Sequence, residues 1–185
     1  MFHLQGQHFE AKDKYPHGCG FDTFTVNSYN NPHLSKSMIQ EIADYDNATR
    51  YNDNVFRKIT EIFKDRVAVL VYVSDHGEEV YDYREFIGRT HEEMKSNEAL
   101  KYQYDVPLVV WFSDKYIQRR SDVVESLKTN ANKRVMIDGL SHLLLGLGCI
   151  NTSYYDSSCD LSSKDYMEKT RIVQNTIDYD VQMSK

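Results

Sequence analysis

The sequence predicts an α/β fold with a mostly parallel central sheet. The main observation is an apolar, largely β-branched run, Val67–Val73, that ends abruptly in the polar segment Ser74–Glu78. Such a run is typical of a strand that is buried on both faces, as in the middle of a parallel sheet. A second apolar run at 106–112 predicts another strand. Apolar residues at helical spacing from Lys36 to Lys64 predict one long helix or two that pack on the sheet.

The rest of the chain shows weaker patterns. Residues 9–36 are rich in Asn, His, Tyr, Gly and Pro, which predicts a long irregular loop, and such a loop is uncommon in a compact domain unless it is functional. After Ser74–Glu78, an acidic and aromatic loop is expected to run to Leu100. The remaining expectations are the tail of a strand at 1–4, helices at 122–130 and 138–147, and either an edge strand or a disordered end at 170–181.

The polar segment after the first long strand is the candidate site. Ligands of open α/β sheets bind just outside the carboxyl ends of the strands, which is where Asp75 and His76 are expected. A carboxylate oxygen and an imidazole nitrogen are both good zinc ligands. His8 follows the other expected strand end, so the two loops are consistent with a shared metal or anion site. The alternative is that Asp75 caps a helix and both histidines are solvated loop residues.

Five segments together resemble the catalytic domain of bacterial phosphoethanolamine transferases, which are membrane-anchored members of the alkaline phosphatase and sulfatase superfamily. In chain order these segments are HLQGQHFEAKDKYP, Tyr45-Asp46-Asn47, VYVSDHGEEVYD, YDVPLVVWFSDKY, and Asp138-Gly-Leu-Ser-His142 followed by LLLGLG. The resemblance covers essentially the whole chain. It implies a partial alkaline-phosphatase-like α/β/α sandwich.

The resemblance also implies a set of site residues. Asp75 and His76 would bind the catalytic zinc, with manganese as the alternative metal, and His8 and His91 would lie near the phosphoryl group or a second metal. The family's Thr nucleophile and a further acidic ligand come from upstream, and no residue here matches the nucleophile. We therefore expect residues 1–185 to form a single partial domain, the C-terminal half of a sulfatase-like catalytic domain, with the upstream half and the membrane domain absent and no measurable transfer by the chain alone.

Several other residues have two interpretations each. Glu78 would orient His76 through a contact to the side of the ring away from the metal, or it would be a surface carboxylate. Lys12 and Lys14 would attract an anionic headgroup or be solvated. His142 would be a hydrogen-bonded core histidine with Asp138 as its partner, one turn earlier, or would have a catalytic role. A bridge between Cys149 and Cys159, with Cys19 free, is left open.

The implied function is transfer of phosphoethanolamine from a phospholipid donor to a lipid A or glycan acceptor, at the periplasmic face of the bacterial inner membrane. Another sulfatase-superfamily hydrolase, a phosphoglycerol transferase, and a non-catalytic fragment with a partial metal site are the alternatives.

A net charge of −6 without a basic run argues against a nucleic-acid partner. No apolar stretch approaches the roughly 20 residues that span a bilayer, and no signal peptide is evident. Self-association through an exposed sheet edge is a further expectation.

Overall fold

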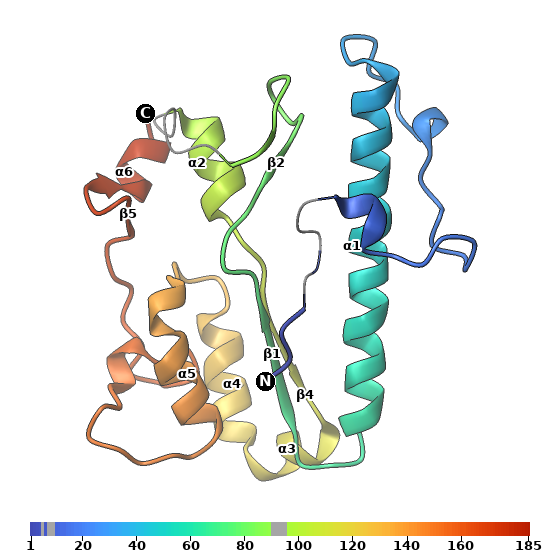
Figure 1. Ribbon diagram of the computed structural model, residues 1–185. Helices are drawn as coiled ribbons and strands as arrows, with labels where there is room; N and C mark the ends of the chain where they lie inside the picture. The colour runs from blue at the N-terminus through green and yellow to red at the C-terminus, as the bar shows by residue number, and fades with distance from the viewer. Residues whose placement is uncertain (5, 7–9, 90–95) are drawn as a thin grey trace. The chain divides into compact units, whose positions relative to one another are not determined.

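The computed structural model describes residues 1–4, 6, 10–89 and 96–185 (Figure 1). Its α-helices are α1 (Lys36–Phe63), α2 (Asn97–Tyr104), α3 (Asp114–Arg119), α4 (Ser121–Asn130), α5 (Leu140–Leu147) and α6 (Tyr179–Met183). Its strands are β1 (Val69–Val73), β2 (Glu79–Val80), β3 (Ile87–Gly88), β4 (Leu108–Phe112), β5 (Ile172–Val173) and β6 (Ile177–Asp178). Short 3-10 turns lie at Ala11–Asp13, Val26–Ser28, Ile137–Gly139 and Ser157–Cys159. This mixture of helices and small sheets confirms the α/β class.

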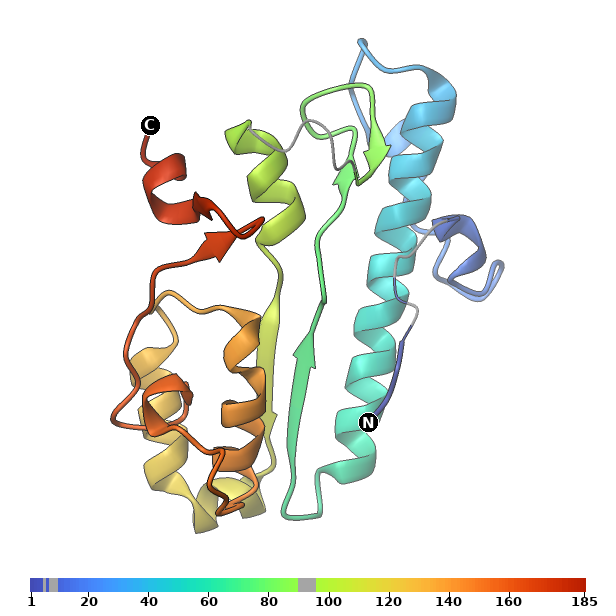
Figure 2. The ribbon, with the colours of Figure 1, turned by 60° about the vertical axis from the view of Figure 1, so that its left-hand side comes forward.

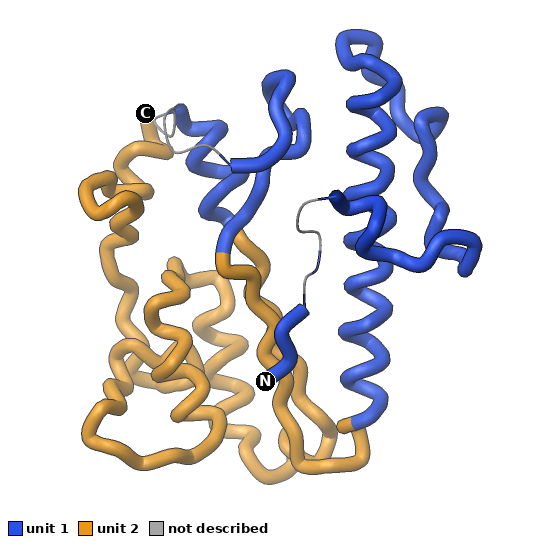
Figure 3. The backbone as a smooth tube through the Cα atoms, viewed as in Figure 1, with its two compact units in different colours: residues 1–62, 76–105 blue, residues 63–75, 106–185 orange. Residues whose placement is uncertain are grey.

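The chain divides into two compact units, which Figure 3 distinguishes by colour. Unit 1 contains Met1–Ile62 and His76–Asp105, and unit 2 contains Phe63–Asp75 and Val106–Lys185. The chain passes from one unit to the other between Asp75 and His76, in the middle of the candidate site segment. The expectations of a single partial domain and of self-association stay predictions.

The core of unit 2 forms against one face of the ribbon made by β1 and β4. Side chains alternate along a strand, so Val69 and Val71 of β1 lie on the same face as the apolar residues of β4 that pack with them. That face covers a buried cluster from α4, α5 and the segment after α5, namely Val123, Leu143, Leu147 and Leu161. Figure 2 shows α4 and α5 beside this ribbon. Removal of these side chains from water is the main stabilising contribution in this unit.

The direction of the paired strands corrects the sequence-based expectation of a mostly parallel sheet. β1 and β4 are antiparallel, with Val69 opposite Phe112 and Val73 opposite Leu108, and the other two strand pairs among the described residues are antiparallel as well. The connection between β1 and β4 explains the direction. The Gly77 N–H donates to the Gln103 carbonyl oxygen at 2.9 Å, so the first and last parts of the connecting segment lie side by side. The next strand therefore runs back along the first. An apolar run predicts burial but carries no information on direction.

Several expected elements agree with the structure and others do not. The residues from 36 to 63 form one 28-residue helix, and the helix that ends before Gly148 is present as α5. Residues 1–4 form no strand, which corrects that expectation, because an apolar start to the chain does not by itself supply a strand to pair with. The C-terminal tail is also corrected. It forms a hairpin, because Gln174 and Asn175 adopt positive φ, and then a helix.

The tail of unit 2 is fixed by charged side chains. Asp180 of α6 forms ion pairs with Arg171 at 2.6 Å and with Arg134 at 3.3 Å, and Arg134 also pairs with Glu168. These contacts connect the last segment to the loop before α5 and account for its order. Among the helices that the structure describes, none has the length and apolar character needed to cross a membrane.

In unit 1 a buried side chain of α1, Asn47, bonds directly to the backbone of the long irregular loop. Asn47 is 1% exposed. Its Oδ1 accepts the N–H groups of Thr23 and Phe24, both at 2.9 Å, and its Nδ2 donates to the Phe24 carbonyl oxygen at 2.9 Å. The amide thus replaces the backbone partners that this loop lacks. The Tyr45–Asn47 segment, which carries part of the resemblance, therefore has a structural role.

Candidate functional site

The candidate site segment forms the loop between β1 and β2, as the sequence predicts. β1 ends at Val73 and β2 begins at Glu79, so both Asp75 and His76 lie in the connecting loop. Asp75 is exposed and is the last residue of its segment of unit 2, whereas His76 is half-buried and is the first of its segment of unit 1. The two residues are adjacent in the chain. That their side chains converge on one point stays a prediction.

The imidazole of His76 has a defined orientation. Its Nδ1 lies 3.0 Å from the carbonyl oxygen of Gly77. Because a carbonyl oxygen can only accept a hydrogen bond, Nδ1 carries the proton and Nε2 carries the lone pair of the neutral ring. Metal-binding histidines commonly donate their other ring N–H to a backbone carbonyl, which fixes the tautomer. The arrangement of His76 therefore suits coordination through Nε2.

Gly77 connects this loop to α2 within unit 1. Its N–H donates to the carbonyl oxygen of Gln103 at 2.9 Å. A Cβ atom at position 77 would overlap the carbonyl oxygen of Tyr102 and lie 3.3 Å from the carbonyl carbon of Gln103. Only glycine allows the backbone to approach the end of α2 this closely. The residue after the candidate metal ligand is thus fixed in position by backbone contacts.

A second anchor, which sequence reasoning missed, is the carboxylate of Glu79. The side chain is fully buried, and it accepts hydrogen bonds from Arg84 at 2.7 and 3.0 Å and from the Gln103 side-chain amide at 2.6 Å. Burial alone would raise the pKa of Glu79, but the hydrogen bonds from Arg84 and Gln103 outweigh it and hold the pKa below its ordinary value. The only signal in the sequence was an arginine five residues later, which local pattern does not distinguish from a solvated charge.

The other predicted ligands cannot be placed. His8 and His91 lie outside the described residues, so their predicted roles stay predictions, as do those of Glu78, Lys12 and Lys14. Within 1–4, 6, 10–89 and 96–185, no group of three or more His, Cys, Asp and Glu side chains could hold a metal ion. Asp75 and His76 have the donor chemistry that zinc requires, but they supply only two of its usual four ligands.

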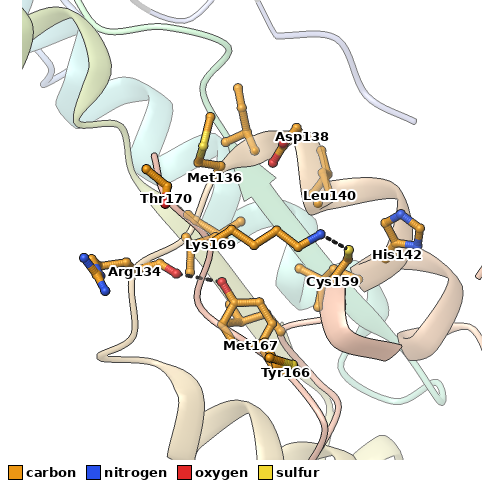
Figure 4. Close-up of a pocket in the computed structure, with 16 residues that line it drawn as sticks. Arg134, Met136, Asp138, Leu140, His142, Cys159, Tyr166, Met167, Lys169 and Thr170 are labelled. Carbon is orange, nitrogen blue, oxygen red and sulfur yellow. Dashed lines mark hydrogen bonds between the residues drawn. The ribbon is translucent and has the colours of Figure 1, made fainter. Parts of the chain in front are cut away.

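Unit 2 contains a cavity of about 250 Å³ between the start of α5 and the segment after Ser157–Cys159. Figure 4 shows that the Lys169 side chain points toward Cys159, and its Nζ donates to the Cys159 Sγ at 2.7 Å. The walls are mostly apolar, with Asp138 and His142 among the polar residues. Asp75, the only member of the predicted metal pair in this unit, does not line the cavity. The cavity is therefore not the predicted metal site.

The environment of His142 differs from the sequence-based expectation. The residue is half-buried in α5, but its Nδ1 accepts the backbone N–H of Asp156 at 3.1 Å. The prediction that Asp138 is its partner is wrong. Asp138 lies in the 3-10 turn before α5, where side chains four residues apart are not placed on one face as they are in an α-helix. His142 therefore connects α5 to the loop that follows it.

The cysteines are free in this structure. Cys149 lies in contact with the Arg120 guanidinium, and Cys159 lies beside Lys169, so each thiol faces a cation. Cys19 is exposed. The bridge that the sequence left open between Cys149 and Cys159 is not formed.

Comparison with known proteins defines the class to which this fold and site belong. The sulfatase family model matches residues 1–144. The chain therefore belongs to the sulfatase family.

Within that family, relatives of this chain include phosphoethanolamine transferases. The chain is 31% identical over 191 residues to phosphoethanolamine transferase EptC of Escherichia coli O18:K1:H7, a match that covers 97% of this chain and 31% of the relative. It is 29% identical over 140 residues to the Kdo(2)-lipid A phosphoethanolamine 7''-transferase of E. coli K12, covering 73% of this chain and 23% of that protein.

A solved structure agrees with these relatives. The C-terminal periplasmic domain of E. coli EptC in complex with Zn superposes with a TM-score of 0.79 at 29% identity, over 95% of this chain and 49% of that chain. The likeness confirms the alkaline-phosphatase-like fold class and the resemblance to the catalytic domain of a metal-dependent phosphoethanolamine transferase. The chain spans about half of that solved domain and about a third of the length of the curated relatives.

Proposed function

We propose that this chain is the metal-binding portion of a catalytic domain that transfers phosphoethanolamine from a phospholipid donor to a lipid A or glycan acceptor. The observation that supports it most strongly is the Asp75–His76 pair in the loop directly after β1, with the His76 tautomer fixed by Gly77. The names of the relatives supply the reaction and one acceptor, and the Zn complex of a relative supplies the metal.

The residues of this chain would act on the metal and on the phosphoryl group. The Asp75 carboxylate and the Nε2 of His76 would hold zinc, with manganese as the alternative. Zinc, when bound, would neutralise charge on the transferring phosphoryl group and lower the pKa of an attacking hydroxyl. His8 and His91 would contact the phosphoryl oxygens or a second metal. Because this proposal rests on residues adjacent in the chain, it requires only that their loop retain its place at the end of β1.

The proposed location is the periplasmic face of the bacterial inner membrane. One observation supports it: the solved relative is a periplasmic domain. The resemblance to membrane-anchored phosphoethanolamine transferases implies the same location. A non-catalytic chain with a partial metal site is the alternative that the experiments below separate from the proposal.

Isothermal titration of zinc into the purified protein tests the metal site. We expect binding that is lost in His76→Ala and in Asp75→Asn. His33→Ala and Asp53→Asn are the matched controls, because both side chains are exposed and lie away from the loop in sequence. If the control variants lose as much affinity as the loop variants, the metal is bound elsewhere.

The reaction is tested with a fluorescent phosphatidylethanolamine analogue and the intact protein that carries this chain. Release of labelled diacylglycerol that depends on zinc and is lost in Asp75→Asn supports transfer. Zinc binding without any release would favour the non-catalytic alternative.

A further inference from the structure

The buried carboxylate of Glu79 has no part in the metal chemistry proposed above. It lies three residues after His76, at the start of β2, and it is fully shielded from water. A buried charge is costly unless it is paired and hydrogen-bonded, so its partners show what the charge holds in place.

These partners come from two directions within unit 1. Arg84, in the turn between β2 and β3, donates from its Nε at 2.7 Å and from its Nη2 at 3.0 Å. Gln103, in the last turn of α2, donates from its Nε2 at 2.6 Å and is itself only 3% exposed. The carboxylate therefore connects the β2–β3 hairpin to the end of α2, across 24 residues of sequence.

Gln103 also holds the loop that contains His76. Its backbone carbonyl oxygen accepts the Gly77 N–H at 2.9 Å, while its side chain donates to Glu79. One residue of α2 thus holds the chain on both sides of Glu78. The lack of space for a Cβ at Gly77 shows how close this contact is. Displacement of Gln103 would release the Gly77 amide, and the Gly77 carbonyl that orients His76 would move with it.

The hairpin is fixed by two further contacts. The register places Glu79 opposite Gly88, and the Tyr81 hydroxyl donates to Glu41 of α1 at 2.6 Å. β3 therefore leaves the hairpin at a fixed point, two residues before the part of the chain that includes His91. The loss of Glu79 would loosen the hairpin at the end nearest to His76.

Stability alone does not explain why a charged group occupies this position. An apolar pair of similar volume is often as stable as a buried ion pair, or more so, whereas a bidentate carboxylate contact has a defined geometry. From these contacts we propose that Glu79, with Arg84 and Gln103, is a positioning residue that fixes the His76 loop in its metal-binding form. The inference rests on the proposed function for the identity of the metal, but the ordering of the loop can be measured without metal.

The test compares Glu79→Gln with Glu85→Gln in the full chain. The control makes the same chemical change at an exposed carboxylate of the same hairpin. Amide hydrogen exchange without metal gives the first measurement. We expect the Gly77 amide to exchange at least about tenfold faster in Glu79→Gln only, while amides of α1 keep their protection. Zinc titration gives the second measurement, with an expected loss of about 10- to 100-fold in affinity, as is typical for groups that support a metal ligand.

Arg84→Gln is the second variant, in case Glu79→Gln does not fold. The Arg84 side chain is 26% exposed, so its replacement is better tolerated, and we expect the same changes at reduced size. Unchanged exchange at Gly77 in a folded variant would overturn the inference. Faster exchange at Gly77 with unchanged zinc affinity would also overturn it, because the ordering of the loop would then have no effect on metal binding. If the unsubstituted protein binds no zinc, the proposed metal function fails, and the exchange result alone decides whether Glu79 orders the loop.

Discussion

Replacement of Asn47 by alanine is expected to destabilise unit 1 strongly. The amide makes three hydrogen bonds of 2.9 Å to the backbone of Thr23 and Phe24, and it is 1% exposed. Loss of each bond costs about 1 kcal/mol where water can partly rehydrate the partner, which gives about 3 kcal/mol in total. The low value per bond applies because Thr23 itself is exposed.

Urea unfolding followed by far-UV circular dichroism measures this change, since the 28-residue α1 contributes a large part of the helical signal. Asn54→Ala is the matched control: it lies on the same helix, and its side chain accepts one hydrogen bond from Arg57. We expect a change of less than about 0.5 kcal/mol for this control. Equal changes in the two variants would refute the role of Asn47 as the anchor of the irregular loop.

Two further predictions concern the loop after β1. Gly77→Ala should lower both the midpoint of thermal unfolding and the zinc affinity. The added Cβ would overlap the Tyr102 carbonyl oxygen and break the hydrogen bond to the Gln103 carbonyl oxygen. An unchanged midpoint in differential scanning calorimetry would contradict this close contact. The pKa of Glu79 is held below its ordinary value of 4.5 in the folded protein, so its contribution to stability is complete above that value and is lost as the pH falls through the folded pKa. The stability difference between the unsubstituted protein and Glu79→Gln should therefore be larger at about pH 6 than at about pH 3, and a difference that does not shrink in acid would count against a charged Glu79.

The sequence was sufficient to predict where the site loop lies but not how the strands around it run. The apolar run to Val73 and the polar residues after it define a strand end from local pattern alone. Strand direction depends on the course of the connection, and that course is set by the contact between Gly77 and Gln103, which lie far apart in the sequence. No periodic pattern contains a contact of this kind.

The supporting residues of the site were harder to predict for the same reason. Of the consecutive acids Glu78 and Glu79, only Glu79 is fully buried, and which one faces inward depends on the partners that Arg84 and Gln103 provide. His142 was correctly expected to be hydrogen-bonded in α5, but its partner is a backbone amide 14 residues later. Local pattern thus predicts which residues are buried, whereas tertiary contacts determine their hydrogen-bond partners.

Zinc-edge anomalous diffraction from crystals grown with zinc tests the central claim most directly. We predict a peak about 2.0–2.2 Å from a carboxylate oxygen of Asp75 and from the Nε2 of His76, the distances typical of zinc ligands. His17 and Asp22 provide an internal comparison, since they form an exposed pair at 2.8 Å that could hold a surface metal. A peak at His17 and Asp22, with none at Asp75 and His76, would contradict the assignment of the loop after β1 as the metal site.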